Sequence, residues 1–425
     1  MIYLKKKKMI LIMCIIALIA VVISHLIFGR GVVQAPGLAQ ENVTVKQSFD
    51  GAQDVQKERK TDVGAQPETE SKESRIDQIK DFILKSDVSM YTYENLISDI
   101  DRLITKYPDD LKVNDLCTTF DGRIVKEILI GSETSKRHIF INGGTHANEY
   151  ISSQLVMKQL ACFLDDVRSN RKYKNVRLSE LCENVAIHVV PMINPDGITF
   201  VQKGLSGMKN KQTIEKINEI AKLDGNSAND SDYQKSWKAN AEGIDINRCY
   251  DSFWKQYNEV NHPSSKYYKG SKVCDSEESL AIANLTKQYL FDCTISYHTQ
   301  GQVVFCVGVD SFTQSIADLT GYTIINQGYI EPAYSDWAGS VLSIPSLTIE
   351  VGCGDNPISF TQFENIWEEN KNVWMEMLFW LRSKVDKTTK LLKPTQKLKK
   401  NETTTSKTVS EKSTTKRIEN GNKKK

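Results

Sequence analysis

The chain has 425 residues, of which 40% are hydrophobic and 25% charged, enough apolar material for a sizeable buried core. The net charge of +2 is unevenly distributed: residues 1–30 carry five positive charges and no negative ones, residues 384–425 hold 14 Lys and Arg against four Asp and Glu, and residues 31–383 sum to −13. A mildly acidic body excludes nucleic acid as its main ligand.

The first 30 residues have the pattern of a transmembrane signal anchor. Four lysines at 5–8 precede an apolar run from Met9 to Phe28, whose 20 residues match the ~20 that a helix needs to cross a bilayer. Lysines before the run predict a cytoplasmic N-terminus, and hence a single-pass protein of the cell membrane with an extracytoplasmic body. The alternative is a cleaved signal peptide, cut near the small residues Gly37 and Ala39.

Two segments have compositions typical of disordered chain. Residues 31–75 are rich in Gln, Glu, Lys, Asp and Gly, and residues 384–425 are rich in Lys and Thr. Neither segment can bury enough apolar surface to fold. We interpret the first as a flexible linker. The second is a basic tail, which can either bind anionic wall polymers or serve only to keep the protein in solution. The folded domain is expected to span residues 76–383.

Within this domain, strand patterns alternate with helical ones. Helical periodicity predicts helices over 92–106, 152–167 (beginning at a Ser cap), 277–289 and 361–383. Runs of β-branched residues bounded by Gly, Pro and Asn predict strands at 124–131, 138–144, 185–193, 294–298, 302–308 and 346–352. The polar residues 203–236 are expected to form a long surface excursion. Strands that alternate with helices indicate an α/β domain.

Five short motifs each come at the end of an apolar strand pattern. They are FINGGTHANEY at 140–150, PMINPDG at 191–197, GIDINR at 243–248, SYHTQG at 296–301 and PSLTIEVG at 345–352. Because ligand sites in α/β sheets form beyond the carboxyl ends of the strands, these motifs are expected to converge on one site. His146 and Glu149 are three residues apart in the first motif, a spacing that can bring an imidazole and a carboxylate to one point.

In order and wording, the motifs resemble those of the zinc metallocarboxypeptidases of the carboxypeptidase A type, over about residues 91–382. The WKAN…GIDIN wording is closer to bacterial relatives that cut γ-D-glutamyl–diaminopimelate bonds of the cell wall. The resemblance implies a mixed central β-sheet flanked by helices, and one Zn²⁺ per chain held by His146, Glu149 and His298. Three protein ligands and one open position form the catalytic type of zinc site, of which carboxypeptidase A is a standard example.

The same resemblance assigns roles to four further residues. Glu350 corresponds to the general base, which takes a proton from the attacking water and passes it to the leaving amine. Lys238 stands at the position where the archetypal enzymes carry an Arg that stabilises the oxyanion. The ammonium group of Lys is a compact positive charge, whereas the planar guanidinium of Arg can donate two parallel hydrogen bonds. Asn247 and Arg248 correspond to the pair that binds the terminal carboxylate of a substrate.

The residue before Asp336-Trp337, Ser335, corresponds to the floor of the specificity pocket. A polar floor tolerates a zwitterionic side chain such as that of diaminopimelate. The mobile tyrosine of the family corresponds to Tyr329 or to Tyr334, since the loop length leaves the alignment ambiguous, and Tyr329 is slightly favoured.

The sequence therefore predicts a zinc metallopeptidase that hydrolyses peptide or γ-D-glutamyl bonds near a free C-terminus, in muropeptides of the cell wall. The alternative is a catalytically inactive wall-binding module on the same fold. The intact metal ligands and Glu350 argue against this alternative, because a decayed site usually loses one of them. The choice between exopeptidase and endopeptidase action stays open at this point.

Overall fold

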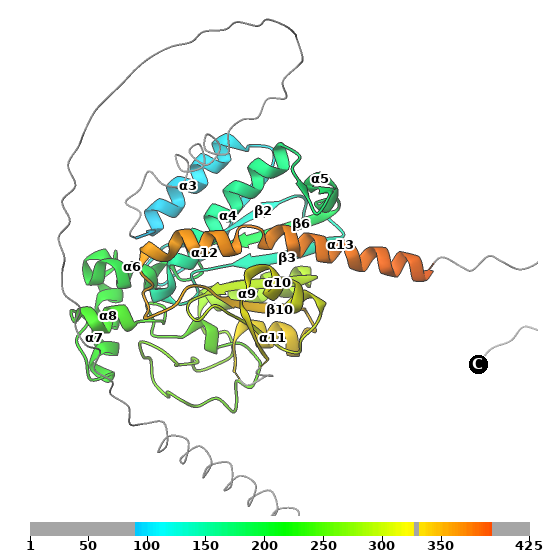
Figure 1. Cartoon of the computed structure of the whole chain (residues 1–425). Coiled ribbons are helices and arrows are strands. Elements are labelled where there is room, and N and C mark those ends of the chain that lie inside the picture. Colours follow the sequence, from blue (N-terminus) through cyan, green and yellow to red (C-terminus); the bar gives the residue numbers. More distant parts are fainter. Residues whose placement is uncertain (1–89, 327–330, 393–425) are drawn as a thin grey trace, which may run out of the picture. The chain divides into compact units, whose positions relative to one another are not determined.

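The computed structural model describes residues 90–326 and 331–392, which belong to the compact unit Thr69–Lys425 (Figure 1). The expected anchor at 1–30, the expected linker at 31–75 and residues 393–425 of the expected tail lie outside the described residues. Within the described part of the chain, no helix combines the length and the apolar character that crossing a bilayer demands.

The domain is built on a mixed eight-stranded sheet, which confirms the expected α/β architecture. In spatial order the strands are β1 (Leu111–Thr118), β2 (Ile124–Ile130), β6 (Val185–Val190), β3 (Arg137–Asn142), β7 (Cys293–His298), β10 (Ser346–Glu350), β8 (Val303–Cys306) and β9 (Thr323–Asn326). Strands β6, β3, β7 and β10 pair in parallel, so their carboxyl ends lie at one edge of the sheet. Pairing is antiparallel at β1–β2, β2–β6 and β10–β8 and parallel again at β8–β9.

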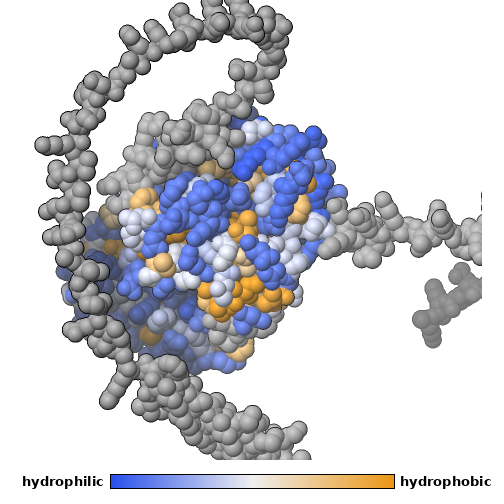
Figure 2. Space-filling model, viewed as in Figure 1, coloured by the Kyte–Doolittle hydropathy of each residue, from blue (hydrophilic) through white to orange (hydrophobic). Residues whose placement is uncertain are grey.

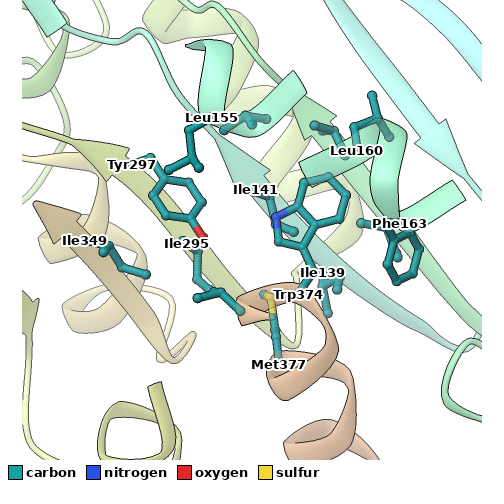
Figure 3. Packing of buried hydrophobic residues seen from close by; sticks show 14 of the residues in the cluster. Ile139, Ile141, Leu155, Leu160, Phe163, Ile295, Tyr297, Ile349, Trp374 and Met377 are labelled. Atoms are coloured by element: carbon teal, nitrogen blue, oxygen red, sulfur yellow. The ribbon is translucent and has the colours of Figure 1, made fainter. Parts of the chain in front are cut away.

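Helices cover both faces of the sheet, and the central strands are buried on both sides. Every residue of β6 and β7 is buried, which explains their continuous apolar runs. Ile139 and Ile141 of β3 belong to the core cluster on one face, while Phe140 between them belongs to the cluster on the other. Figure 3 shows the first cluster, where these isoleucines pack with Leu155 and Trp374.

The helices can be grouped by the apolar cluster to which their buried residues belong. The helices of at least four residues are α3 (Tyr93–Lys106), α4 (Ile151–Arg168), α5 (Leu178–Leu181), α6 (Pro195–Lys203), α7 (Lys211–Leu223), α8 (Ser231–Ser236), α9 (Glu277–Tyr289), α10 (Ser311–Thr320), α11 (Tyr334–Ser340), α12 (Phe363–Asn370) and α13 (Val373–Leu392). Helices α3, α4, α10, α12 and α13 contribute to the first cluster, and α9 and α11 to the second. Hydrophilic residues dominate the outer surface of the helices in the view of Figure 2, as expected of amphipathic helices.

Three expectations about helices need correction. Helix α4 begins after Tyr150, so Ser152 is no cap: its hydroxyl donates to the carbonyl of Glu149 and accepts from the amide of Gly144. The polar stretch 203–236 is no mere excursion, because α7 and α8 fold there around a third apolar cluster that includes Trp237. The helix expected at 361–383 is broken between α12 and α13, and α13 continues to Leu392.

Candidate metal centre

The expected site residues gather at the edge where the parallel strands end. His146 follows β3, His298 is the last residue of β7, and Glu350 is the last residue of β10. The parallel register of β7 and β10 sets Glu350 directly opposite His298. Three segments far apart in the sequence therefore deliver their polar side chains to one place.

His146, Glu149 and His298 converge on a single point. The Nδ1 atoms of His146 and His298 each lie 2.8 Å from a different carboxylate oxygen of Glu149. The candidate ligand atoms of the three residues lie within 4.8 Å of one another, and all three residues are buried. The short 3₁₀ turn η1 (Ala147–Glu149) starts at His146 and turns Glu149 back toward the imidazole.

This donor set fits zinc. Two imidazole nitrogens and one carboxylate oxygen are the ligands of many catalytic zinc sites, and three donors leave a position open. Asp245 supports one of them, since its Oδ1 atom lies 3.2 Å from Nε2 of His146, on the side of the ring away from Glu149. A carboxylate in this position fixes the orientation of a ligating imidazole and increases its basicity.

Asp245 was not identified from the sequence as part of the site. The sequence signal for Asp245 is its place in the GIDINR motif, two residues before Asn247. Its side chain is completely buried, so its negative charge needs hydrogen-bonding partners. In addition to His146, it accepts hydrogen bonds from the backbone amides of Asn247 and Tyr267.

Lys238 lies beside the metal ligands. Its ammonium Nζ is 3.0 Å from Oε1 of Glu149. The negative charge of Glu149 raises the pKa of Lys238 to about 12, so the side chain stays protonated at neutral pH. Burial alone would raise the pKa of Glu149, but the charges of His146 and Lys238 hold it well below its usual range. The carbonyl of Lys238 also accepts a hydrogen bond from the amide of Ala147, which joins its segment to the turn η1.

Glu350 faces the same cavity in a half-buried position. Burial, together with the negative charge of Glu149, raises the pKa of Glu350 to about 8. A cation held by the neighbouring ligands would favour the ionised form of this carboxyl group.

A cavity of about 230 Å³ unites these groups. It is lined by His146, Glu149, Lys238, Asn247, Arg248, Phe305, Cys306, Glu331, Ala333, Ser335, Asp336, Thr348 and Glu350. Most of the residues expected from the sequence are therefore brought together, and His298, which does not line the cavity, contacts Glu149. Glu331 and Thr348 were not expected in the site.

Arg248 and Ser335 both line this cavity, and each has a polar partner there. The Nη2 atom of Arg248 lies 2.9 Å from Oε2 of Glu331. The hydroxyl of Ser335 accepts a hydrogen bond of 2.9 Å from Thr348, so a pair of hydroxyl groups forms part of the wall.

Of the two candidates for the mobile tyrosine, the structure describes Tyr334 and not Tyr329. Tyr334 is buried in the second core cluster, where its hydroxyl lies 3.0 Å from Oγ1 of Thr286, and it does not line the cavity. Tyr329 falls within 327–330, outside the described residues.

Comparisons with known proteins agree with this geometry. Residues 96–332 match the family model described as zinc carboxypeptidase. Gamma-D-glutamyl-L-diamino acid endopeptidase 1 of Lysinibacillus sphaericus is 27% identical over 299 residues, covering 68% of this chain and 72% of that relative. Carboxypeptidase B of Helicoverpa zea is 26% identical over 197 residues, covering 45% of this chain and 39% of that relative.

Solved structures support the fold. Thrombin activatable fibrinolysis inhibitor superposes with a TM-score of 0.54 at 15% identity, covering 73% of this chain and 80% of that chain. Carboxypeptidase A from Helicoverpa armigera gives a TM-score of 0.50 at 14% identity, covering 73% of this chain and 82% of that chain. At such low identity these likenesses concern the fold alone.

Proposed function

The chain belongs to the zinc carboxypeptidase family, and from this premise we propose that it hydrolyses amide bonds in cell-wall stem peptides, including γ-D-glutamyl bonds. The observation that carries the proposal is the convergence of His146, Glu149 and His298 on one point, beside a cavity that Glu350 also lines. The name of the Lysinibacillus sphaericus relative, a gamma-D-glutamyl-L-diamino acid endopeptidase, supports this choice of bond.

The three converging side chains would hold the metal. Bound by His146, Glu149 and His298, zinc supplies Lewis-acid chemistry: it polarises a carbonyl group and makes water a stronger nucleophile at neutral pH. Asp245 keeps the ring of His146 oriented toward Glu149 and therefore toward the metal position.

Glu350 is the general base of this proposal. Its carboxylate lines the cavity at the end of β10, in register with His298. A water molecule in the cavity would lie within hydrogen-bond reach of this carboxylate. In the ionised form Glu350 takes a proton from the water, and it then returns the proton to the nitrogen that leaves.

Lys238 and Arg248 supply positive charge at two positions of the cavity lining. The protonated Lys238, fixed beside Glu149, stabilises the negative charge that develops on the oxygen of the scissile carbonyl. Arg248, with Asn247, can bind a carboxylate of the substrate, because a guanidinium fork matches a carboxylate in geometry. The hydroxyl pair of Ser335 and Thr348 suits a polar side chain, such as the zwitterionic end of diaminopimelate.

The cellular setting of the proposal rests on sequence patterns. The lysines at 5–8 and the apolar run at 9–28 support a membrane anchor with the catalytic domain outside the cell membrane. The positive charge of residues 384–425 supports binding to anionic wall polymers.

Incubating the zinc-loaded protein with defined muropeptides, followed by mass spectrometry of the products, tests the proposed substrate. We expect release of fragments cut at the bond between D-glutamate and the diamino acid. An intact muropeptide after incubation with protein that holds zinc would contradict the proposal and favour a wall-binding module without activity.

A further inference from the structure

Arg248 already has a carboxylate partner in the cavity. Its Nη2 atom contacts Oε2 of Glu331 at 2.9 Å, and its Nη1 atom donates to the carbonyl of Asn247 at 2.9 Å. The side chain of Arg248 is only 12% exposed, whereas that of Glu331 is 38% exposed. Both residues line the same cavity as Glu350. The group expected to attract a substrate carboxylate is therefore neutralised by the chain itself.

Hydrogen bonds of the segment that carries Glu331 hold this residue beside Arg248. Hydrogen bonds hold the segment 331–334 in place at Glu331 and after it, so the contact of Glu331 with Arg248 is part of the built site. Three hydrogen bonds do this: Tyr250 N to Pro332 O at 3.0 Å, Tyr334 N to Asn247 Oδ1 at 3.0 Å, and Glu331 N to Asp336 Oδ2 at 3.1 Å.

We propose that Glu331 is a specificity-determining residue that competes with the carboxylate of a substrate for Arg248. The proposal rests on the proposed function, since it concerns peptide substrates in the same cavity. It assigns the preferred substrate class: peptides in which the carboxyl group that reaches Arg248 is blocked as an amide, so that cleavage occurs within a chain rather than at its end.

The preference follows from charge. A substrate with a free carboxylate must displace Glu331 from Arg248 and then lie beside the displaced carboxylate, and like charges in close contact disfavour binding. A substrate that continues as an amide brings no negative charge. Its carbonyl oxygen can accept a hydrogen bond from the guanidinium while the ion pair between Arg248 and Glu331 is kept.

The test compares two peptides that differ only at the C-terminus, one a free acid and the other a carboxamide. We expect the wild-type protein to cleave the amide at least as efficiently as the acid. Glu331→Gln should raise the ratio of kcat/KM for the acid to kcat/KM for the amide by about tenfold or more, mainly through a lower KM for the acid. The value for the amide should change little.

Matched variants separate this role from a merely structural one. Glu331→Asp keeps the charge and should keep the wild-type ratio, while Glu331→Ala removes the charge in another way and should reproduce the effect of Glu331→Gln. Glu133→Gln breaks an exposed ion pair with Lys112, which does not line the cavity, and should leave the ratio unchanged.

Two adverse results have different meanings. An active Glu331→Gln variant whose ratio equals that of the wild type would overturn the role of Glu331 and leave the proposed function intact. A zinc-loaded wild-type protein that cleaves neither peptide nor any muropeptide would overturn the proposed function, and this inference with it.

Discussion

His146 and Glu149 could be predicted as neighbours in space because they are neighbours in sequence, three residues apart at the end of a strand. His298 required more, since it lies 149 residues after Glu149, and only the resemblance to a known family connected it to them. The partners of these residues were harder to predict. Asp245 lies 99 residues from His146, and Glu331 reaches Arg248 from another segment, so no local pattern reveals either contact.

The role of Glu350 can be isolated by Glu350→Gln. The amide cannot accept a proton from water, so we expect turnover to fall by about two to four orders of magnitude. Zinc content should be unchanged, because His146, Glu149 and His298 are intact, and metal analysis of the same sample provides that control.

The pH dependence gives a second measurement on the same residue. Burial raises the pKa of Glu350 in the metal-free site, and a bound cation lowers it again. Because the base works only when ionised, wild-type kcat/KM should fall as pH drops through the pKa that Glu350 has beside the metal. A Glu350→Gln variant that retains activity within a few-fold of wild type would remove Glu350 from the role of base.

Among the secondary-structure elements, strands whose side chains are buried on both faces of the sheet were the easiest to predict. Strands β6 and β7 are buried throughout and therefore read as continuous apolar runs. The edge strands β1 and β9 were missed, because a strand that is partly exposed carries polar residues without a clear alternation. The helix α7 was missed for a related reason: its polar residues outnumber the few that pack inward, such as Ile217 and Ile220.

Helix α9 contains a buried acid that should lower stability at neutral pH. Glu278 is 1% exposed, and its Oε2 atom accepts a hydrogen bond from Asn240 at 3.2 Å, while its Oε1 atom has no hydrogen-bond partner among the described residues. Burial raises the pKa of Glu278 to about 7 from an ordinary value of 4.5. The folded chain therefore keeps a proton that the unfolded chain releases between these two values, so stability falls as pH rises through this window.

Glu278→Gln should remove this penalty. We expect the free energy of unfolding to rise by about 1–3 kcal/mol at pH 8 and to change little near pH 4.5, as measured by urea titration. Glu277→Gln changes the exposed neighbour on the same helix and should have little effect at either pH. A Glu278→Gln variant that is less stable than wild type at pH 8 would contradict the expected cost of this buried charge.

On the scale of the whole molecule, we propose a catalytic domain between a membrane anchor and a basic tail, and of these three parts the structure describes the domain. The α/β fold could be predicted because local patterns and the order of motifs agree on it. The end of the last helix could not be predicted, since the Lys-rich composition after 383 hides the continuation of α13 to Leu392. Composition reports average polarity, whereas a helix needs only a few well-placed apolar residues.

The tail can be tested by deleting residues 393–425, which carry 11 Lys and Arg against three Glu. We expect weaker sedimentation with purified cell walls at low salt and unchanged hydrolysis of small soluble peptides. The difference should vanish at 1 M salt, where the Debye length falls to about 3 Å from about 10 Å at 0.1 M. A tail of equal length with Gln in place of Lys should behave like the deletion. Equal sedimentation of all three proteins would show that the tail only adds solubility.

The most direct test of the account is the zinc content of the purified protein, measured by metal analysis in the wild type and in His298→Ala. We predict one zinc ion per wild-type chain, and loss of both zinc and peptide hydrolysis in His298→Ala, because two remaining ligands hold the metal too weakly. His262→Ala is the control, since His262 does not line the cavity, and it should keep the full zinc content. A His298→Ala protein that retains both zinc and hydrolysis would contradict the assignment of this metal centre.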